Sequence, residues 1–245
     1  MPRFFVPSQN VCENVIKITG DDAFHIARSL RMAEGDEITV CDMHSTEHIC
    51  RLTKIRDEEC ECVILSSKKS DTDPPFPITL YMAYPKGDKL ETVVQKAVEL
   101  GAKRIVPFES SRCIKKPKAE KQDKQTARLQ RIAEEAAKQC GRASLPEVAQ
   151  PIQYREMLKE AVNADLALFC YEGDGGRSLK AVLEENADIP KSISVIVGCE
   201  GGFSLEEAEA AIAAGCISVT LGKRILRCET APSYALSAIS YRYEL

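Results

Sequence analysis

The sequence predicts an α/β fold in two domains, a small β-barrel followed by a parallel α/β sheet. Short β-branched segments occupy most of the first 70 residues, and a polar, then proline-rich stretch follows at residues 66–77. From there to the end, apolar strand-like segments alternate with helix-like ones, which is typical of a parallel sheet with crossover helices. A chain of 245 residues is long enough for one or two cores. We therefore expect domains at residues 1–72 and 73–245.

The first domain is expected to hold strands at residues 37–42, 48–55 and 61–65, with one helix at 21–30. Between the first two strands, His44, Glu47 and His48 match the H-x-x-E-H spacing of a class of zinc peptidases. That chemistry needs both imidazoles on one face of a helix. Strand-like residues lie on both sides, so we predict a hairpin turn and no metal site.

In the second domain we expect strands at residues 78–84, 104–108, 165–172, 192–198 and 216–222. Helices are expected between them at 89–100, 121–140, 178–185 and 205–214, and a final helix runs to Leu245. The strands are apolar without alternation, as expected of a sheet buried on both faces. Ser204 and Glu207 predict a capping box at the start of the fourth helix.

Composition excludes several classes of protein. Hydrophobic residues make up 44% and charged residues 29%, as in ordinary globular proteins. No apolar run approaches the roughly 18 residues that span a bilayer, and the opening MPRFFVPSQN lacks the pattern of a secretory signal. Eleven cysteines occur without a C-x-x-C pair, which favours reduced thiols. We expect a cytoplasmic protein that makes no contact with membranes.

The net charge of −4 hides an uneven distribution. Residues 103–142 carry 12 Lys and Arg against 5 Asp and Glu, whereas the segments before and after are acidic. Affinity for a polyanion follows the charges that it touches, so this stretch is a candidate nucleic-acid surface. The alternative is a solvated helix face.

A glycine-rich or charged segment follows each of three expected strands. GDGGR at residues 173–177 and GCEGGFS at 198–204 follow two of them, and neither matches the G-x-G-x-x-G dinucleotide fingerprint. Each could be only a tight turn, or could let the backbone approach a ligand closely. Arg224, Arg227 and Glu229 follow the third strand. Ligands of open α/β sheets bind at the carboxyl ends of strands, which favours a site here.

GCEGGFS followed by LGKRILRCETA resembles the signature of the knotted SPOUT methyltransferases. Within these, the chain resembles the family that methylates N3 of a uridine in 16S ribosomal RNA. The likeness extends to MPRFF, HIARSLRMAEGDEITVCD, KGDKLETVVQKAVELGAKRIVPFES and RLQRIAEEAAKQCGRASLPEV, and so covers both domains. One residue departs from the family pattern, because Cys199 stands where the family usually has proline.

The resemblance implies a PUA-like RNA-binding barrel, a SPOUT-type parallel sheet with a C-terminal trefoil knot, and a homodimer. It further implies S-adenosylmethionine as the cofactor and 16S ribosomal RNA, on the assembled small ribosomal subunit, as the substrate. Carried over to this sequence, the cofactor-binding residues are Tyr171, Glu172, Val197, Gly198, Glu200, Gly201, Gly202, Leu221, Gly222, Arg224, Ile225 and Leu226.

Methylation of this substrate requires removal of a proton, because a uridine N3 carries a proton and is not nucleophilic until that proton leaves. Arg227 is expected to stabilise the developing negative charge, since arginine stays protonated. Glu229 is expected to accept the proton, or else only to cap a helix, and proximity alone could suffice. The residues expected to contact RNA are Arg3, Arg28, Arg31, Arg112, Lys115 and Lys116.

One alternative concerns the function of the whole chain. The chain could be an RNA-binding module that kept the fold and lost catalysis.

The final helix is expected to contribute the dimer interface, since its apolar stripe is wider than one sheet face should need. That stripe consists of Ala231, Tyr234, Ala235, Leu236, Ala238, Ile239 and Tyr241.

Overall fold

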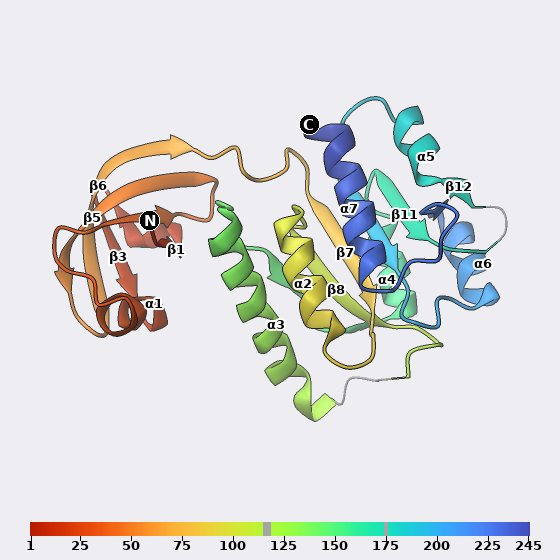
Figure 1. The fold of residues 1–245 in the computed structure, drawn as a ribbon, viewed down its shortest axis with the longest axis horizontal. Coiled ribbons are helices and arrows are strands. Elements are labelled where there is room, and N and C mark those ends of the chain that lie inside the picture. The colour runs from red at the N-terminus through yellow and green to blue at the C-terminus, as the bar shows by residue number, and fades with distance from the viewer. Residues whose placement is uncertain (115–118, 174–175) are drawn as a thin grey trace. The chain divides into compact units, whose positions relative to one another are not determined.

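Two separate cores organise the chain in the computed structural model, which describes residues 1–114, 119–173 and 176–245 (Figure 1). The first unit comprises Met1–Asp73 together with Ala137–Leu145. The second unit comprises Pro74–Ala136 and Pro146–Leu245.

The first unit is built on a six-stranded sheet in the order β1-β4-β5-β6-β3-β2. Apolar side chains of its strands, such as Phe4, Ile16, Ile38 and Leu52, fill a single core. Its strands are β1 (Arg3–Phe5), β2 (Val11–Cys12), β3 (Val15–Thr19), β4 (Glu37–Cys41), β5 (Thr46–Ile55) and β6 (Glu59–Lys69). The 3-10 helix η1 (Ser8–Asn10), α1 (Asp21–Phe24) and the π-helix η2 (His25–Ser29) complete the unit.

The three strands expected in this unit are present, and three shorter ones were not expected. β1 to β3 hold two to five residues each, too short to show a clear apolar alternation. β6 continues to Lys69, into the stretch that the sequence analysis treated as linker, because its last residues pair with β5. A strand can continue as an exposed two-stranded ribbon on polar residues, which hydropathy does not reveal.

The H-x-x-E-H segment forms a hairpin between β4 and β5, as predicted. The carboxylate of Asp42 accepts hydrogen bonds from the backbone N–H groups of His44 and Thr46, at 2.9 and 3.1 Å. Met43 and Ser45 adopt positive φ angles, which a tight turn requires. Glu47 and His48 then lie on β5, so the two histidines do not share a helix face.

The end of helix α3 (Ala119–Cys140) and the loop after it belong to the first unit, which the sequence analysis did not anticipate. The Lys138 ammonium lies 2.7 Å from the Asp22 carboxylate, and the Arg142 guanidinium lies 2.8 Å from that of Asp73. Arg142 is buried. These ion pairs tie a distant part of the chain to the barrel residues, and such long-range pairing leaves no trace in local periodicity.

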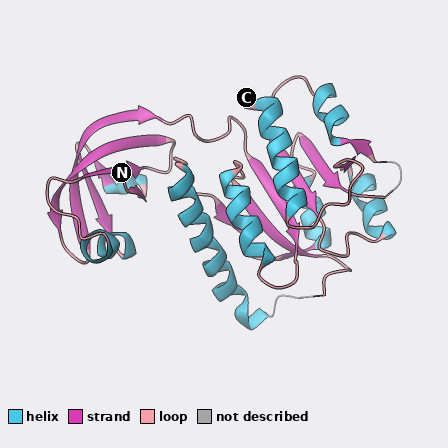
Figure 2. Cartoon of the chain, viewed as in Figure 1, coloured by secondary structure: helices cyan, strands magenta, loops and turns pink. Residues whose placement is uncertain are grey.

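The second unit has a parallel sheet in the order β10-β8-β7-β13-β11-β14-β12, with β9 paired to β8 and helices packed against the sheet (Figure 2). Its strands are β7 (Ile78–Ala83), β8 (Arg104–Glu109), β9 (Glu147–Val148), β10 (Ile152–Gln153), β11 (Leu166–Cys170), β12 (Arg177–Ser178), β13 (Ile193–Val197) and β14 (Ile217–Thr220). Its helices are α2 (Lys89–Glu99), most of α3, α4 (Tyr154–Ala161), α5 (Leu179–Glu185), α6 (Leu205–Ala214) and α7 (Thr230–Tyr243).

All five strands and five helices expected in this unit are present. The capping box of α6 is confirmed: the Glu207 N–H donates to the Ser204 hydroxyl at 3.2 Å, and the Ser204 N–H donates to the Glu207 carboxylate at 2.9 Å. Helix α4 was not expected. Its eight residues carry mainly polar side chains, and a capping box of Gln153 and Glu156 starts the helix.

The sheet order brings three strand ends together. Cys170 at the end of β11 pairs in register with Val197 at the end of β13 and with Val219 near the end of β14. Because all three strands are parallel, the loops that follow them leave the same edge of the sheet side by side. This places the three segments singled out from the sequence at one location.

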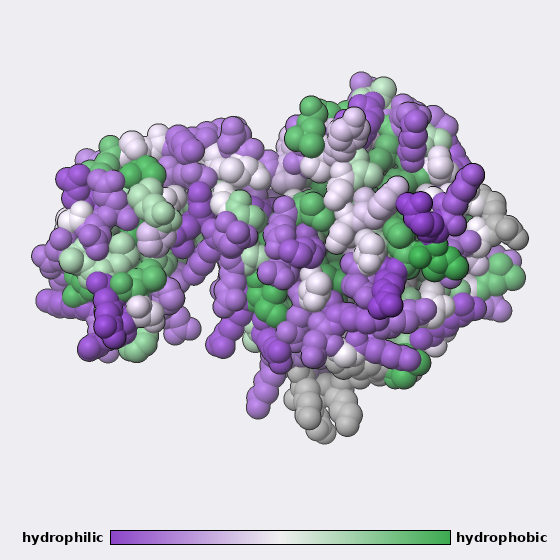
Figure 3. Space-filling model, in the orientation of Figure 1, coloured by the Kyte–Doolittle hydropathy of each residue, from purple (hydrophilic) through white to green (hydrophobic). Residues whose placement is uncertain are grey.

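The face shown in Figure 3 is mostly hydrophilic, with hydrophobic residues in small patches. Among the described residues, no helix is long and apolar enough to cross a membrane.

Candidate functional site

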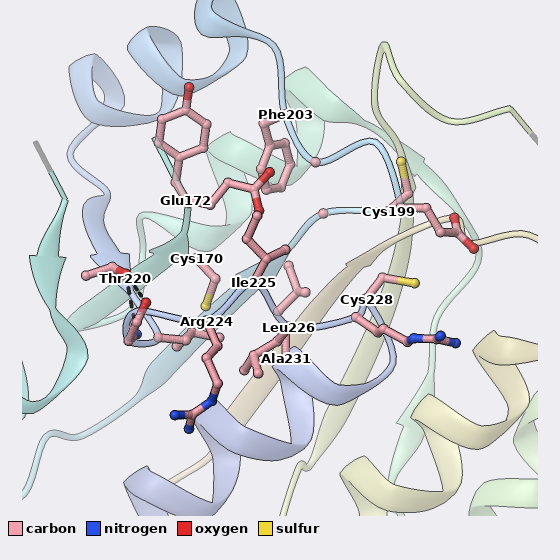
Figure 4. A pocket seen from close by; sticks show the side chains of 18 of the residues that line it. Cys170, Glu172, Cys199, Phe203, Thr220, Arg224, Ile225, Leu226, Cys228 and Ala231 are labelled. Atoms are coloured by element: carbon pink, nitrogen blue, oxygen red, sulfur yellow. Dashed lines mark hydrogen bonds between the residues drawn. The ribbon is translucent and has the colours of Figure 1, made fainter. Parts of the chain in front are cut away.

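The loops after β11, β13 and β14 surround a cavity of about 470 Å³ (Figure 4). This volume lies in the range of small-molecule sites. Most of the expected cofactor residues line it, namely Tyr171, Glu172, Val197, Gly198, Glu200, Gly202, Leu221, Gly222, Arg224, Ile225 and Leu226, and so does Arg227. Cys170, Cys199 and Lys223 of the same loops line it too, and so do residues that were not expected to hold the cofactor, namely Lys89, Phe203, Val219, Thr220, Cys228 and Ala231.

The loop after β13 makes a tight turn that depends on glycine. The Gly202 N–H donates to the Cys199 carbonyl at 2.9 Å, and Gly202 has a φ of +63°, where side chains are disfavoured. A Cβ atom on Gly198 would lie 3.1 Å from the Gly202 Cα and from the Phe203 ring. Glycine at these positions therefore serves both the turn and the close approach of backbone to the cavity.

Gly201 has a different neighbour from the other glycines of this loop. It does not line the cavity, and a Cβ atom there would lie 3.1 Å from the Arg112 Cβ. The Arg112 guanidinium donates to the Gly201 carbonyl at 2.8 Å. Arg112 therefore contacts the glycine loop at a residue that does not face the cavity.

Aromatic and aliphatic side chains form much of the cavity wall. The Phe203 ring lies 4.4 Å from that of Phe169 and stacks on that of Phe108 at 6.3 Å, measured between ring centroids. Ile225 is 82% exposed on the loop after β14. In Figure 4 the Arg224 guanidinium points away from Phe203 and Glu172. An exposed isoleucine beside an apolar wall is well placed to cover a flat ligand.

A charged cluster lies at one side of the cavity. The Lys89 ammonium, at the start of α2, lies 2.8 Å from Glu200 and 3.4 Å from Glu229. Both oxygens of Glu200 also accept the backbone N–H of Lys86, at 3.1 and 3.2 Å. Partial burial acts to raise the Glu200 pKa, but these hydrogen bonds outweigh it and hold the pKa below its ordinary value. No local pattern around Lys89 indicated this role.

Arg227 and Glu229 stand next to each other in space. Arg227 is 83% exposed, and its guanidinium lies 4.0 Å from the Glu229 carboxylate. Glu229 occupies the N-cap position of α7 without making a side-chain capping bond, and it does not line the cavity. A hydrogen bond from its own backbone N–H, with Cys228 and Lys89 nearby, holds its pKa below the ordinary value. At neutral pH the carboxylate is therefore ionised.

Cys199 belongs to a buried group of polar side chains. The Ser110 hydroxyl lies 3.3 Å from the Cys113 sulfur and 4.0 Å from the Cys199 sulfur. The hydrogen bond between the two thiols lowers the pKa of Cys199 and raises that of Cys113. In the sequence, Cys199 stands out only as a departure from the family pattern.

The expected RNA-contacting residues fall in different places. Arg28 pairs with Asp57 at 2.6 Å on the exposed surface of the first unit, and Arg31 is exposed there with a φ of +50°. Arg3 is largely buried beside Glu47 in the same unit. Arg112 is in the second unit, and Lys115 and Lys116 lie outside the described residues.

Comparison with known proteins identifies the family. An RNA methyltransferase domain model matches residues 72–240, and an RNA methyltransferase PUA domain model matches residues 18–65. Ribosomal RNA small subunit methyltransferase E of Bacillus subtilis is 34% identical, over 100% of this chain and 98% of the relative. The chain belongs to the ribosomal RNA small subunit methyltransferase E family.

Two further relatives agree with this membership. The ribosomal RNA small subunit methyltransferase E of Synechocystis is 32% identical, over 97% of this chain and 77% of its own length. The solved structure of the Neisseria gonorrhoeae enzyme, bound to S-adenosylmethionine, matches with a TM-score of 0.85 at 34% identity and covers 98% of this chain and 97% of that one. The expected fold class is confirmed: the chain combines a PUA-like domain with the parallel α/β sheet of the methyltransferase E family.

Proposed function

We propose that this protein transfers a methyl group from S-adenosylmethionine to N3 of a uridine in 16S ribosomal RNA, in the cytoplasm and on the assembled small subunit. The observation that carries the proposal is the meeting of three loops around one cavity in a member of this family. We assign RNA binding to residues 1–72 and methyl transfer to residues 73–245.

The lining of the cavity fits the cofactor. Backbone of the glycine loop lines the cavity at Gly198 and Gly202, and a Cβ atom on Gly202 would lie 3.4 Å from the Glu172 carboxylate. Apolar side chains such as Leu226 and Val219 suit an adenine ring, and Glu172 supplies an acceptor for a hydroxyl or an ammonium group. When bound, S-adenosylmethionine supplies an electrophilic methyl group on a sulfonium.

Arg227 and Glu229 are the residues that we assign to activation of the uridine N3. Arg227 stabilises the negative charge that develops on the uracil when N3 loses its proton, and its exposure leaves it free to reach an RNA base. Glu229, held ionised, accepts that proton directly or through water. Among residues 1–114, 119–173 and 176–245, no group of three or more His, Cys, Asp or Glu side chains that could hold a metal ion is found.

The structure also bears on the expected homodimer. The stripe on α7 divides into two faces: Ala231, Ala235 and Ile239 are buried within the second unit, whereas Tyr234 and Tyr241 are exposed. The outer face adjoins an apolar hollow of about 330 Å³ between α5 and α7, lined in part by Leu179, Leu183 and Ala238. A second copy of this chain that covers these residues is the partner that we propose.

Two measurements test the proposal. Calorimetry with the purified chain should detect S-adenosylmethionine binding, and a chain that binds RNA but no cofactor would instead be the RNA-binding module without catalysis. A modification map of 16S ribosomal RNA from cells that lack the gene should lose one N3-methyluridine. The return of that modification with the wild-type gene, but not with an Arg227→Ala gene, would support the assigned role.

A further inference from the structure

We propose that Lys89 is a positioning residue that fixes the loops after β13 and β14 in the arrangement that binds the cofactor. This inference rests on the proposed function. Lys89 lies in KGDKLETVVQKAVELGAKRIVPFES, one of the blocks that carry the family resemblance, but outside the two loop motifs. Lys89 is the first residue of α2, more than 100 residues before either loop in the sequence.

Contacts of the Lys89 ammonium join three parts of the chain. It donates to Glu200 of the glycine loop at 2.8 Å, lies 3.4 Å from Glu229 of the loop after β14, and lies 3.9 Å from the Cys228 sulfur. The backbone N–H of Lys86, just before α2, holds the same Glu200 carboxylate. The start of α2 therefore holds both loops.

Electrostatics explains why a cation is needed at this point. Glu200 and Glu229 are both within 3.4 Å of one nitrogen, so their carboxylates would repel each other across the gap between the loops without it. The groups that face the ammonium are these two carboxylates and the Cys228 thiol, and Arg227 lies 4.0 Å from Glu229 on the far side. All three side chains of the cluster are about a quarter to a third exposed, so solvent weakens each pair. The link therefore restrains loop geometry more than it stabilises the fold.

Lys96 provides a matched control on the same helix. It pairs with Glu99, three residues further along α2, at 2.8 Å and contacts neither loop. Lys96→Met therefore removes a similar partly exposed ion pair and leaves the cavity untouched. Lys89→Met removes the ammonium from the loops, and Lys89→Arg retains a cation that can bridge two carboxylates.

The experiment measures S-adenosylmethionine affinity by calorimetry and methyl transfer to undermethylated small subunits. We expect Lys89→Met to weaken cofactor binding by about tenfold, the usual scale for loss of one charge-assisted hydrogen bond. Its unfolding temperature should match that of Lys96→Met, which should bind the cofactor like the wild type. Lys89→Arg should recover most of the affinity. If Lys89→Met and Lys96→Met bind the cofactor equally well, the inference is wrong.

A pH profile separates positioning from general stability. Loss of the cation should raise the pKa values of Glu200 and Glu229, so the acidic limb of methyl transfer should move to higher pH in Lys89→Met and return in Lys89→Arg. An unmoved limb would contradict the inference.

Glu200→Gln tests the same link if Lys89→Met does not fold. In the Glu200→Gln background, Lys89→Gln should cost little further affinity, because both changes disturb one bond. Additive losses would overturn the inference. If the wild-type chain itself bound no cofactor, both the proposed function and the inference would fail. If the wild type bound the cofactor and the Lys89 variants bound it equally well, only the inference would fail.

Discussion

The guanidinium of Arg3 lies 3.0 Å from the carboxylate of Glu47, and the two side chains are only 16% and 5% exposed. Arg3 also donates to the backbone carbonyl of Arg142 at 3.2 Å, and the Ser70 hydroxyl donates to Glu47 at 2.9 Å. This arrangement makes Arg3 part of the packing of the first unit. Any contribution of Arg3 to RNA binding would have to come from its remaining exposed surface.

Arg3→Ala should lower the free energy of unfolding by about 3 kcal/mol, because it leaves the buried Glu47 carboxylate without its closest cation. Arg28→Ala is the control, since the Arg28–Asp57 pair is exposed and its loss should change stability little. Urea unfolding of both variants gives the comparison. Equal stability of the two variants would mean that the Arg3 pair is as weak as a surface pair.

Stability should also depend on pH through Glu47. Burial acts to raise its pKa, but hydrogen bonds from Arg3 and Ser70 outweigh burial and hold the pKa below the ordinary 4.5. The contribution of the carboxylate is therefore fully present above about pH 4.5 and is lost as the pH falls through the folded-state pKa. Between pH 7 and pH 3, Glu47→Gln should lose less stability than the wild type. Parallel curves for the two proteins would contradict this.

Gly202→Ala should abolish cofactor binding in a folded chain, because the φ of +63° is strained for alanine and Gly202 lines the cavity. Gly215→Ala also places alanine at a positive φ, +107°, but it ends α6, where an added Cβ would meet open space. Both variants should lose stability, and only Gly202→Ala should lose calorimetric binding of S-adenosylmethionine. Intact affinity in Gly202→Ala would remove the glycine loop from the cofactor site.

RNA affinity should fall steeply with salt, and replacement of Lys115 and Lys116 by glutamine should reduce the slope of log K against log salt by about 1.5. Each phosphate contact contributes about 0.7 to 0.9 to that slope. Lys191→Gln is the control, because Lys191 precedes β13 at the opposite end of the sheet from the three loops. An unchanged slope in the double variant would assign the basic stretch to a solvated face.

Ala238→Asp should convert a dimer of twice 27.1 kDa into monomers without methyl transfer, since the charge would be buried unpaired where the second copy packs. Ala235 is unsuitable for this test because it is fully buried inside the subunit. Ala213→Asp places the same charge on an exposed alanine of α6, which does not line that hollow, and should remain dimeric. Light scattering distinguishes the two, and active monomers of Ala238→Asp would show that methyl transfer does not need the second copy.

The parts of this fold that periodicity and caps encode were predictable. The strands that end at the three loops are apolar runs, and Ser204 with Glu207 marks the start of α6 by a purely local pattern. Lys89 was not predictable, since its partners Glu200 and Glu229 are far away in sequence and a lysine on a helix is usually solvated. The trefoil knot remains a prediction from the resemblance, because the path of a chain through its own loops leaves no periodic signal.

The return of residues 137–145 to the first unit has a consequence for synthesis on the ribosome. The first 73 residues emerge early, yet they lack the partners of Asp22 and Asp73 until Lys138 and Arg142 have been added. The first unit therefore lacks these two ion pairs while more than 60 residues of the second unit are synthesised. A gene fragment that ends at Asp73 would lack them permanently, whereas the same fragment joined to residues 137–145 by a short linker would regain them.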